Sequence, residues 1–233
     1  MRIGILQTDR VMERFRGRHG DYPEMFEDVL TAAADGETLD FEAIDSMASA
    51  YPGPGSCDAY VITGSRQSVY DGDPWIAGLA EFVGEALDAG SKVVGICFGH
   101  QLIAHFFGGE AGPAPGWAVG VHESRIVADA PWLDPGMDSF RLLSSHKDQV
   151  TRLPEGAELF ATNEFCPIAG FTWGDGVLAL QGHPEFRKPY SMDLMNMRRD
   201  LLGEDTYRAG VASLDEDIHP VAVGRWMLNF CRG

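Results

Sequence analysis

The chain has 233 residues, 45% of them hydrophobic, and carries a formal net charge of −17 at pH 7. This acidity argues against non-specific binding to nucleic acid or to an anionic membrane, because both depend on clusters of Lys and Arg that neutralise phosphate. The sequence has no apolar run near the roughly 20 residues that span a bilayer and shows no signal-peptide core at its start, so we expect a cytoplasmic protein.

The first half of the chain alternates between strand-like and helix-like segments. Strands are predicted over Arg2–Thr8, Leu39–Met47, Ala59–Thr63 and Lys92–Ile96, helices over Pro23–Ala34 and Trp75–Leu87, and a polar, basic loop over Asp9–Gly20. This alternation predicts an α/β fold, with a mostly parallel, flavodoxin-like sheet covered by helices on both faces. In such sheets ligands bind at the carboxyl ends of the strands, which is where Gly64 and Cys97 fall.

The second half of the chain has a different pattern. Short β-like runs are predicted over Val119–Ala128, Phe140–Ser144, Glu158–Thr162, Ile168–Thr172 and Val177–Gln181, and helices over Ser191–Leu202 and Val221–Cys231. We expect these runs to form antiparallel strands that extend the first sheet or pack on it, in a pairing that the sequence leaves open. No linker or internal repeat separates the two halves, so we expect a single domain over residues 1–233.

Cys97 stands at a sharp turn between a predicted strand, Lys92–Ile96, and a predicted helix. Gly95 and Gly99 on either side of it remove the Cβ atoms that would clash in so tight a turn. This pattern is typical of a nucleophile elbow, in which the helix N-terminus faces the side chain and favours the thiolate over the thiol. The alternative is a small buried cysteine at the end of a strand.

A second strand end carries a candidate base for this thiol. His183 follows the predicted strand Val177–Gln181, and Gly182 breaks the strand just before it. In an extended segment His183 and Glu185 project to the same side, so the carboxylate can accept the imidazole N–H and stabilise the imidazolium. Cys97, His183 and Glu185 therefore form a plausible triad. The alternative is a turn histidine beside an exposed glutamate.

Four fragments in order along the chain carry a family resemblance. GICFGHQ at residues 95–101 and QGHPEF at residues 181–186 resemble the paired signatures of class I glutamine amidotransferases. Between them, SSHKDQV at residues 144–150 resembles a stretch of the amidotransferase domain of GMP synthase, and VITGS at residues 61–65 resembles the family's oxyanion strand end. The resemblance covers about residues 3–186 and implies the class I amidotransferase fold with added antiparallel strands.

The resemblance also implies a role for each matching residue. It assigns a catalytic triad to Cys97, His183 and Glu185, an oxyanion hole to the backbone N–H groups of Phe98 and Gly64, and contacts with the amino-acid end of glutamine to Gln101, Ser145 and His146. Cys97 would attack the side-chain amide of glutamine and form a γ-glutamyl thioester, which water would hydrolyse to release glutamate. His183 would deliver the proton to the departing ammonia.

Three functions remain open at this stage. The first is a stand-alone glutaminase that supplies ammonia to a separate acceptor or synthetase protein. The second is a γ-glutamyl peptidase or hydrolase acting on a small γ-glutamyl compound, since ITGSRQSVYDGDPWI at residues 62–76 resembles the plant γ-glutamyl peptidases. The third is a non-catalytic binding module. The basic segment Asp9–Gly20 would dock an acidic partner, bind the carboxylates of a larger substrate, or be simply solvated.

No cofactor is expected from the sequence. It contains no phosphate-binding glycine motif, and its histidines and cysteines lack the spacing of metal ligands. The four cysteines form no CxxC pair, which argues against a disulfide framework or a zinc ribbon, and they occupy positions Cys57, Cys97, Cys166 and Cys231.

Overall fold

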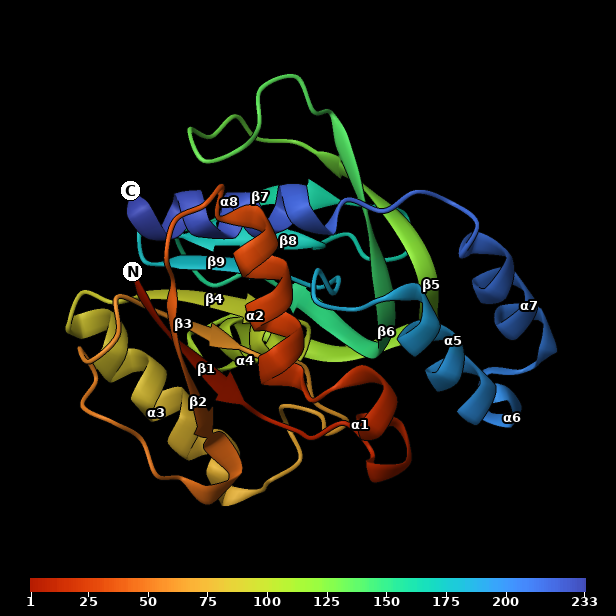
Figure 1. Ribbon diagram of the computed structural model, residues 1–233, viewed down its shortest axis with the longest axis horizontal. Coiled ribbons are helices and arrows are strands. Elements are labelled where there is room, and N and C mark those ends of the chain that lie inside the picture. The colour runs from red at the N-terminus through yellow and green to blue at the C-terminus, as the bar shows by residue number, and fades with distance from the viewer.

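The alternating segments of the first half form the parallel part of one nine-stranded sheet in the computed structural model, which describes residues 1–233 (Figure 1). Its strand order is β2-β1-β3-β4-β9-β8-β7-β5-β6. The parallel strands are β2 (Asp40–Asp45), β1 (Arg2–Gln7), β3 (Ala59–Ile62), β4 (Lys92–Ile96) and β9 (Val177–Leu180). Because β4 and β9 are parallel neighbours, the segments that follow them meet at the same edge of the sheet.

The remaining strands extend this sheet in antiparallel fashion, as predicted. They are β8 (Gly170–Trp173), β7 (Ala157–Thr162), β5 (Glu110–Ile126) and β6 (Ser139–Arg152). The expectation of an antiparallel strand over Val177–Gln181 was wrong at one edge, because β9 runs parallel to β4 and is antiparallel only to its other neighbour. A short apolar run carries no signal for its direction. The predictions for β5 and β6 were too short, because β5 begins at Glu110 and β6 continues to Arg152. The missed part of β5 contains two prolines and two glycines and has a register shift between Pro113 and Ala118, so it lacks the alternation of an ordinary strand.

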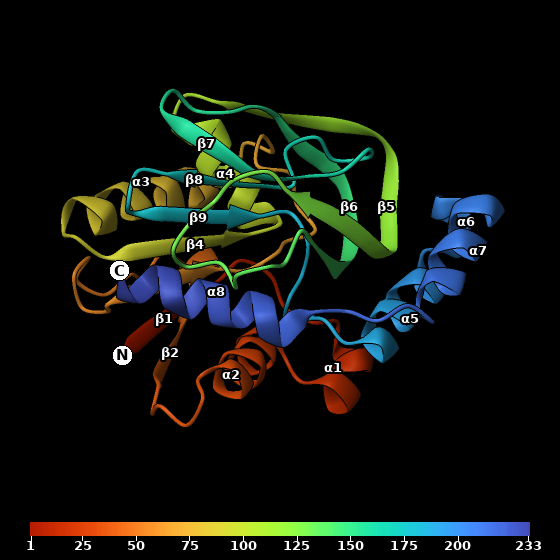
Figure 2. The same cartoon turned by 90° about the horizontal axis from the view of Figure 1, so that it is seen from above.

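Helices cover both faces of the sheet, as the alternation predicted. Figure 2 shows α2 (Tyr22–Ala33) and α8 (Pro220–Arg232) on one face and α3 (Pro74–Asp88) and α4 (Phe98–Phe106) on the other. Asp21 is the N-cap of α2, and its carboxylate accepts a hydrogen bond from the N–H of Tyr22. The predicted apolar stripe of α2 is buried. On α8, Trp226 is completely buried in the core beneath the sheet.

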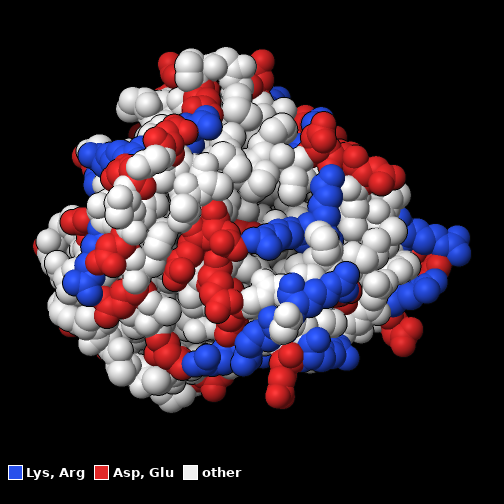
Figure 3. All heavy atoms as spheres, viewed as in Figure 1, with Lys and Arg blue, Asp and Glu red and all other residues white.

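Two segments differ from their predictions. The expected basic loop contains a short helix, α1 (Glu13–His19), which buries no residue and therefore gives no apolar periodicity. Three arginines of the segment Asp9–Gly20 form ion pairs within the protein. Arg10 pairs with Asp45, Arg16 with Asp21 and Arg18 with Asp193. Figure 3 shows basic side chains gathered on this side of the molecule. These ion pairs connect the segment to the end of β2 and to Asp193.

The single helix expected over Ser191–Leu202 is two helices, and a third follows them. These are α5 (Lys188–Met197), α6 (Arg199–Leu202) and α7 (Glu204–Ser213), which project beyond β5 and β6 in Figure 2. The α7 helix was missed because Gly210 is its only buried residue, so it has no apolar stripe. Short η1 (Ser46–Ala48) follows β2. None of the helices combines the length and apolar character needed to cross a membrane.

Candidate active site

Cys97 lies in the tight turn between β4 and α4, in a backbone conformation that is rare for a residue with a side chain. Its φ is 53° and its ψ is −96°. Such conformations cost on the order of 1–3 kcal/mol and persist only where the surroundings hold them. Here the Cys97 N–H donates to the carbonyl of Leu180 on β9 at 2.8 Å, and the Cys97 carbonyl accepts from the Gln101 N–H at 3.1 Å. The turn therefore has the strained geometry of a nucleophile elbow.

The two glycines beside Cys97 are required by close packing, as expected. A Cβ added at Gly95 would lie 2.7 Å from the carbonyl carbon of Gly99, and one added at Gly99 would lie 2.7 Å from Cβ of Ile62. Real Cβ atoms essentially never approach other atoms so closely. The N-terminus of α4 can therefore sit tightly against β3 and β4, with its first N–H groups directed toward Cys97.

His183 and Glu185 follow β9 at the same edge of the sheet and are both buried. The Nδ1 atom of His183 lies 2.7 Å from Oε1 of Glu185. Two further contacts hold the imidazole in place. The backbone N–H of His183 donates to the carbonyl of Leu143 on β6 at 2.8 Å, and the ring of Phe186 stacks on the imidazole with centroids 3.8 Å apart. The carboxylate thus fixes the ring so that Nε2 is left free for another partner.

The electrostatic surroundings of His183 favour its protonated form. Burial lowers the pKa of His183, but the charges of Glu185 and Cys97 outweigh this effect and raise the pKa to about 10. Glu185 lies too deep for solvent to screen its charge. The site therefore holds a protonated His183, whose charge is balanced by the carboxylate of Glu185.

Gly64 lies beyond the end of β3, close to both His183 and Cys97. A Cβ added there would lie 2.8 Å from Cε1 of His183 and 3.7 Å from Cβ of Cys97. The Gly64 N–H donates no hydrogen bond within the protein, and Phe98 opens α4, where helical N–H groups lack carbonyl partners. Both predicted oxyanion donors are thus placed beside Cys97 with N–H groups available for a ligand.

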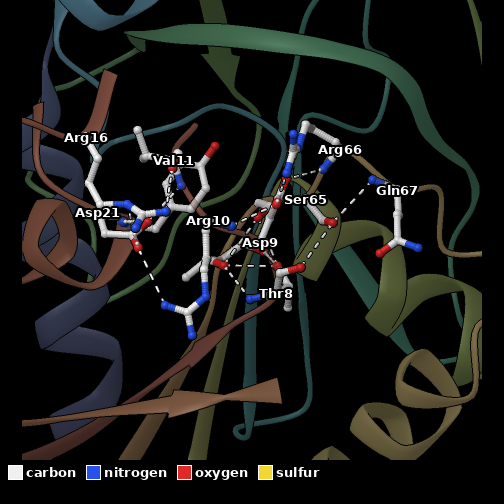
Figure 4. A network of polar contacts seen from close by, with 12 residues as sticks. Thr8, Asp9, Arg10, Val11, Arg16, Asp21, Ser65, Arg66 and Gln67 are labelled. Atoms are coloured by element: carbon white, nitrogen blue, oxygen red, sulfur yellow. Dashed lines mark hydrogen bonds and ion pairs between the residues drawn. The ribbon is translucent and has the colours of Figure 1, made fainter. Parts of the chain in front are cut away.

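A polar network fixes the chain on either side of Gly64. The Oγ1 atom of Thr8 donates to the carbonyl of Gly64 at 2.9 Å, and Ser65 Oγ donates to the carbonyl of Thr8 at 3.2 Å. Arg66 binds the carboxylate of Asp9 through both its side chain and its backbone N–H, with Nε at 2.7 Å (Figure 4). These contacts tie the Gly64 segment to the end of β1.

Replacing Gly64 with Ala is expected to impair the site without unfolding the protein. The added methyl group would lie 2.8 Å from the His183 ring, so the imidazole must move away from Glu185 or Cys97. Displacements of about 1 Å in an active site can cost about 100-fold in rate. We expect kcat/KM to fall by about that factor with little change in Tm. A variant with wild-type kcat/KM would show that the ring approaches Gly64 less closely than described.

The remaining predicted site residues lie in a cleft beside Cys97. This cleft has a volume of about 60 Å³, and its walls include Cys97, Gln101, Ser145 and His146. The Nε2 atom of Gln101 donates to the carbonyl of Asp148 at 2.8 Å, and Nδ1 of His146 lies 2.9 Å from the same carbonyl. Burial lowers the pKa of His146 to about 3, so this imidazole stays neutral and is less suited than His183 to hold a proton.

Several residues of the cleft were not predicted. Asp148 belongs to the SSHKDQV fragment, but the family resemblance assigns it no role. Its carboxylate accepts hydrogen bonds from Ser68 Oγ at 2.5 Å and from Tyr70 OH at 3.0 Å. Those bonds join the loop after Gly64 to β6. The other unpredicted residues of the cleft include Arg66, Trp117, Lys147 and Arg198. Arg66 and Lys147 lie within quoted fragments but were given no role, and Trp117 and Arg198 fall in the segments whose structure was predicted least well.

Comparison with known proteins agrees with this fold and with the four sequence fragments. A family model described as glutamine amidotransferase class-I matches residues 40–196. The chain is 32% identical over 187 residues to gamma-glutamyl peptidase 5 of Arabidopsis thaliana, which covers 76% of this chain and 73% of that protein. It is 30% identical over 186 residues to the glutamine-hydrolyzing GMP synthase of Aeropyrum pernix, which covers 78% of this chain and 35% of that protein.

A solved structure shows the same architecture. The crystal structure of a glutamine amidotransferase from Thermotoga maritima superimposes with a TM-score of 0.78 at 18% identity, covering 100% of this chain and 99% of that one. The chain therefore belongs to the class I glutamine amidotransferase family.

Proposed function

We propose that this protein hydrolyses the γ-amide bond of γ-glutamyl compounds through a γ-glutamyl thioester on Cys97. The observation that carries the proposal is the meeting of three groups at one sheet edge. Cys97 is held in a strained elbow, His183 lies beside it, and Glu185 holds His183 Nδ1 at 2.7 Å. A binding module has no need of a thiol, an imidazole and a carboxylate in this arrangement.

Acylation would begin with attack of the Cys97 thiolate on the γ-carbonyl carbon of the substrate. The oxyanion that forms would be stabilised by the N–H groups of Gly64 and Phe98, each worth about 2.7–4 kcal/mol in well-studied enzymes. His183 would give its Nε2 proton to the departing nitrogen as the C–N bond breaks. The products of this step are a γ-glutamyl thioester and a free amine, or ammonia when the substrate is glutamine.

Deacylation would return the enzyme to its starting state. Water attacks the thioester carbonyl while His183 takes one of its protons at Nε2. The C–S bond then breaks and releases a γ-carboxyl group and the Cys97 thiolate. Throughout both steps Gln101, Ser145 and His146 would hold the amino-acid end of the γ-glutamyl group, a role supported by their place in the cleft beside Cys97.

Two substrate classes fit this chemistry. The relatives named gamma-glutamyl peptidase, which align over 76% of this chain, support a γ-glutamyl amino acid or peptide as substrate. The similarity to GMP synthase supports glutamine, and in that case the ammonia would pass to a separate acceptor or synthetase protein. We favour the peptide class, because the similarity to gamma-glutamyl peptidase 5 spans 73% of that protein and the similarity to GMP synthase spans 35% of that one.

A direct comparison of substrates tests this choice. Purified protein is incubated with glutamine, glutathione and γ-glutamyl dipeptides, and free glutamate and ammonia are measured. We expect faster release of glutamate from at least one γ-glutamyl peptide than from glutamine. Turnover of glutamine alone would instead support the glutaminase. No turnover, together with failure of a glutamine-mimicking electrophile to label Cys97, would support the non-catalytic binding module.

A further inference from the structure

Gln101 lines the cleft beside Cys97, and both N–H groups of its side-chain amide are already used within the protein. Its Nε2 atom donates to the carbonyl of Asp148 at 2.8 Å and to Oε1 of Gln181 at 3.2 Å. A primary amide nitrogen has two N–H groups, so no donor is left. The Oε1 atom of Gln101 accepts no hydrogen bond from the protein and is not closed off from solvent. Gln101 therefore offers the cleft an acceptor and no donor.

The orientation of the Gln101 amide is set by its two partners. The backbone carbonyl of Asp148 can only accept a hydrogen bond, so Gln101 must turn its Nε2 atom toward it. The second N–H of Gln101 then requires an acceptor, which Gln181 supplies. A rotated Gln101 amide would place its oxygen against the Asp148 carbonyl and the Gln181 oxygen. Gln181 and Asp148 thus hold Oε1 of Gln101 toward the cleft.

Gln181 is buried and contacts Gln101 through its oxygen alone. It directly follows β9, only 2% of its surface is exposed, and its backbone N–H donates to the carbonyl of Ala169 at 2.9 Å. The Nε2 atom of Gln181 is buried without a hydrogen-bond partner. Burial of an unpaired donor is unfavourable, and an apolar side chain would avoid it. The acceptor oxygen is therefore the part of the Gln181 amide that has a use.

The γ-glutamyl group has one cationic donor that suits the free oxygen of Gln101, its α-ammonium. An amide oxygen stabilises an ammonium through a charge-assisted hydrogen bond, whereas an amide NH₂ in the same place would repel it. Asp148 lines the same cleft, and its carboxylate is bound by two hydroxyl groups and by no cationic side chain. The orientation of the Gln101 amide therefore decides how well a free α-amino group is recognised.

We propose that Gln181 is a positioning residue, which holds Oε1 of Gln101 toward the cleft and so makes the enzyme select acyl groups that carry a free α-ammonium. This inference rests on the proposed γ-glutamyl hydrolysis and concerns the acyl side of the substrate. Gln181 does not line the cleft, so it acts through Gln101, which makes the contact.

The test compares two substrates with the same leaving group, γ-glutamylglycine and glutarylglycine, which lacks the α-amino group. The ratio of their kcat/KM values is the quantity of interest, and partial unfolding of a variant cancels in it. A charge-assisted hydrogen bond corresponds to about 10- to 100-fold, and a neutral one to about 3- to 10-fold. We expect the wild-type ratio to favour γ-glutamylglycine by the first factor. The Gln181→Met and Gln181→Leu ratios should be smaller than the wild-type ratio by the second factor.

Three further variants show whether this effect is exerted through Gln101. Gln181→Glu keeps an acceptor oxygen and should keep most of the wild-type ratio. Gln101→Met removes the atom that contacts the substrate, so its ratio should fall close to one, and addition of Gln181→Met should lower it no further. Gln149→Met is the matched control and should keep the wild-type ratio. Gln149 is also a buried glutamine, but it does not line the cleft, and its side-chain oxygen has no hydrogen-bond partner.

Two results for the variants would overturn the inference. One is a Gln181→Met ratio equal to the wild-type ratio or to a fall that Gln181→Glu shares. The other is an equal fall caused by Gln181→Met in the presence and in the absence of Gln101→Met, which would mean that Gln181 acts independently of Gln101. A wild-type ratio near one would overturn it as well. Failure of the wild-type protein to cleave γ-glutamylglycine would instead overturn the proposed function.

Discussion

Replacement of Cys97 with Ala is expected to abolish hydrolysis of every γ-glutamyl substrate while the protein stays folded. In a comparable triad, removal of the nucleophile alone costs about 10⁶ in kcat. The alanine side chain fits the same backbone and loses only the sulfur atom, so the core around the elbow should remain packed. Steady-state rates with γ-glutamyl dipeptides and glutamine, and thermal unfolding followed by circular dichroism, measure the two effects. Activity within tenfold of wild type would show that Cys97 is not the nucleophile.

Cys166→Ala is the matched control for this change. Cys166 is also buried, and burial raises the pKa of its thiol to about 12, so it stays protonated and unreactive at neutral pH. We expect this variant to keep most of the wild-type activity. A loss as large as that of Cys97→Ala would indicate that removal of any buried thiol in this region disrupts the site, and the assignment of the nucleophile would then lose its support.

The second large effect is expected from Glu185→Gln. The amide keeps the size of the side chain but removes the negative charge that lies 2.7 Å from His183 Nδ1. A side-chain amide can present its NH₂ group to the ring and favour the wrong tautomer, a change that costs about 10⁴ in kcat in the serine protease triad. We expect a loss of about 10³ to 10⁴ in kcat with a far-UV spectrum like that of the wild type.

The pH dependence of Glu185→Gln separates this charge effect from a loss of structure. The Glu185 charge helps to raise the pKa of His183 to about 10, so the proton on His183 is retained until the pH nears that value. The wild-type kcat/KM should therefore fall on the alkaline side near pH 10. Removing the charge lowers the pKa of His183, so the alkaline limb of the residual activity should move to lower pH. An unshifted limb would contradict the role given to Glu185.

The same pKa shift predicts how this pair contributes to stability. The folded-state pKa of His183 lies above its ordinary value of 6.5, so the contribution is fully present below pH 6.5 and is lost as the pH rises toward 10. The unfolding free energy of Glu185→Gln should therefore depend less on pH over this window than that of the wild type. Urea unfolding at several pH values compares the two proteins.

The elbow and the parallel strands were predictable because their signals are local. Gly95 and Gly99 flank Cys97 within a few residues, and β1, β3 and β4 are short, mostly apolar runs. Parallel neighbours then bring their carboxyl ends together, so Cys97 and His183 meet although they lie far apart in sequence. The triad was therefore predicted from local patterns and the family fragments, whereas the parallel pairing of β4 and β9 that joins its members was not predicted.

The other residues of the cleft are brought together by contacts between distant segments, which no local sequence pattern predicts. Arg198 reaches Ser145 across 53 positions of sequence, because α5 packs against β6. Trp117 lies in the irregular part of β5, where Pro and Gly residues interrupt the alternation of apolar and polar side chains that predicts a strand. The α1 helix is joined to a distant segment by the ion pair of Arg18 with Asp193. A run of arginines has the same sequence pattern in a solvated loop and in such a helix.

The acyl-enzyme on Cys97 can be observed directly. Wild-type protein is mixed with γ-glutamylglycine, quenched with acid within the first turnovers, digested with protease and mapped by mass spectrometry. We expect a γ-glutamyl group on the peptide that contains Cys97, lost on treatment with hydroxylamine as a thioester is, and absent when Cys97→Ala is treated in the same way. A γ-glutamyl group on another residue, or undiminished hydrolysis by Cys97→Ala, would contradict the proposed mechanism.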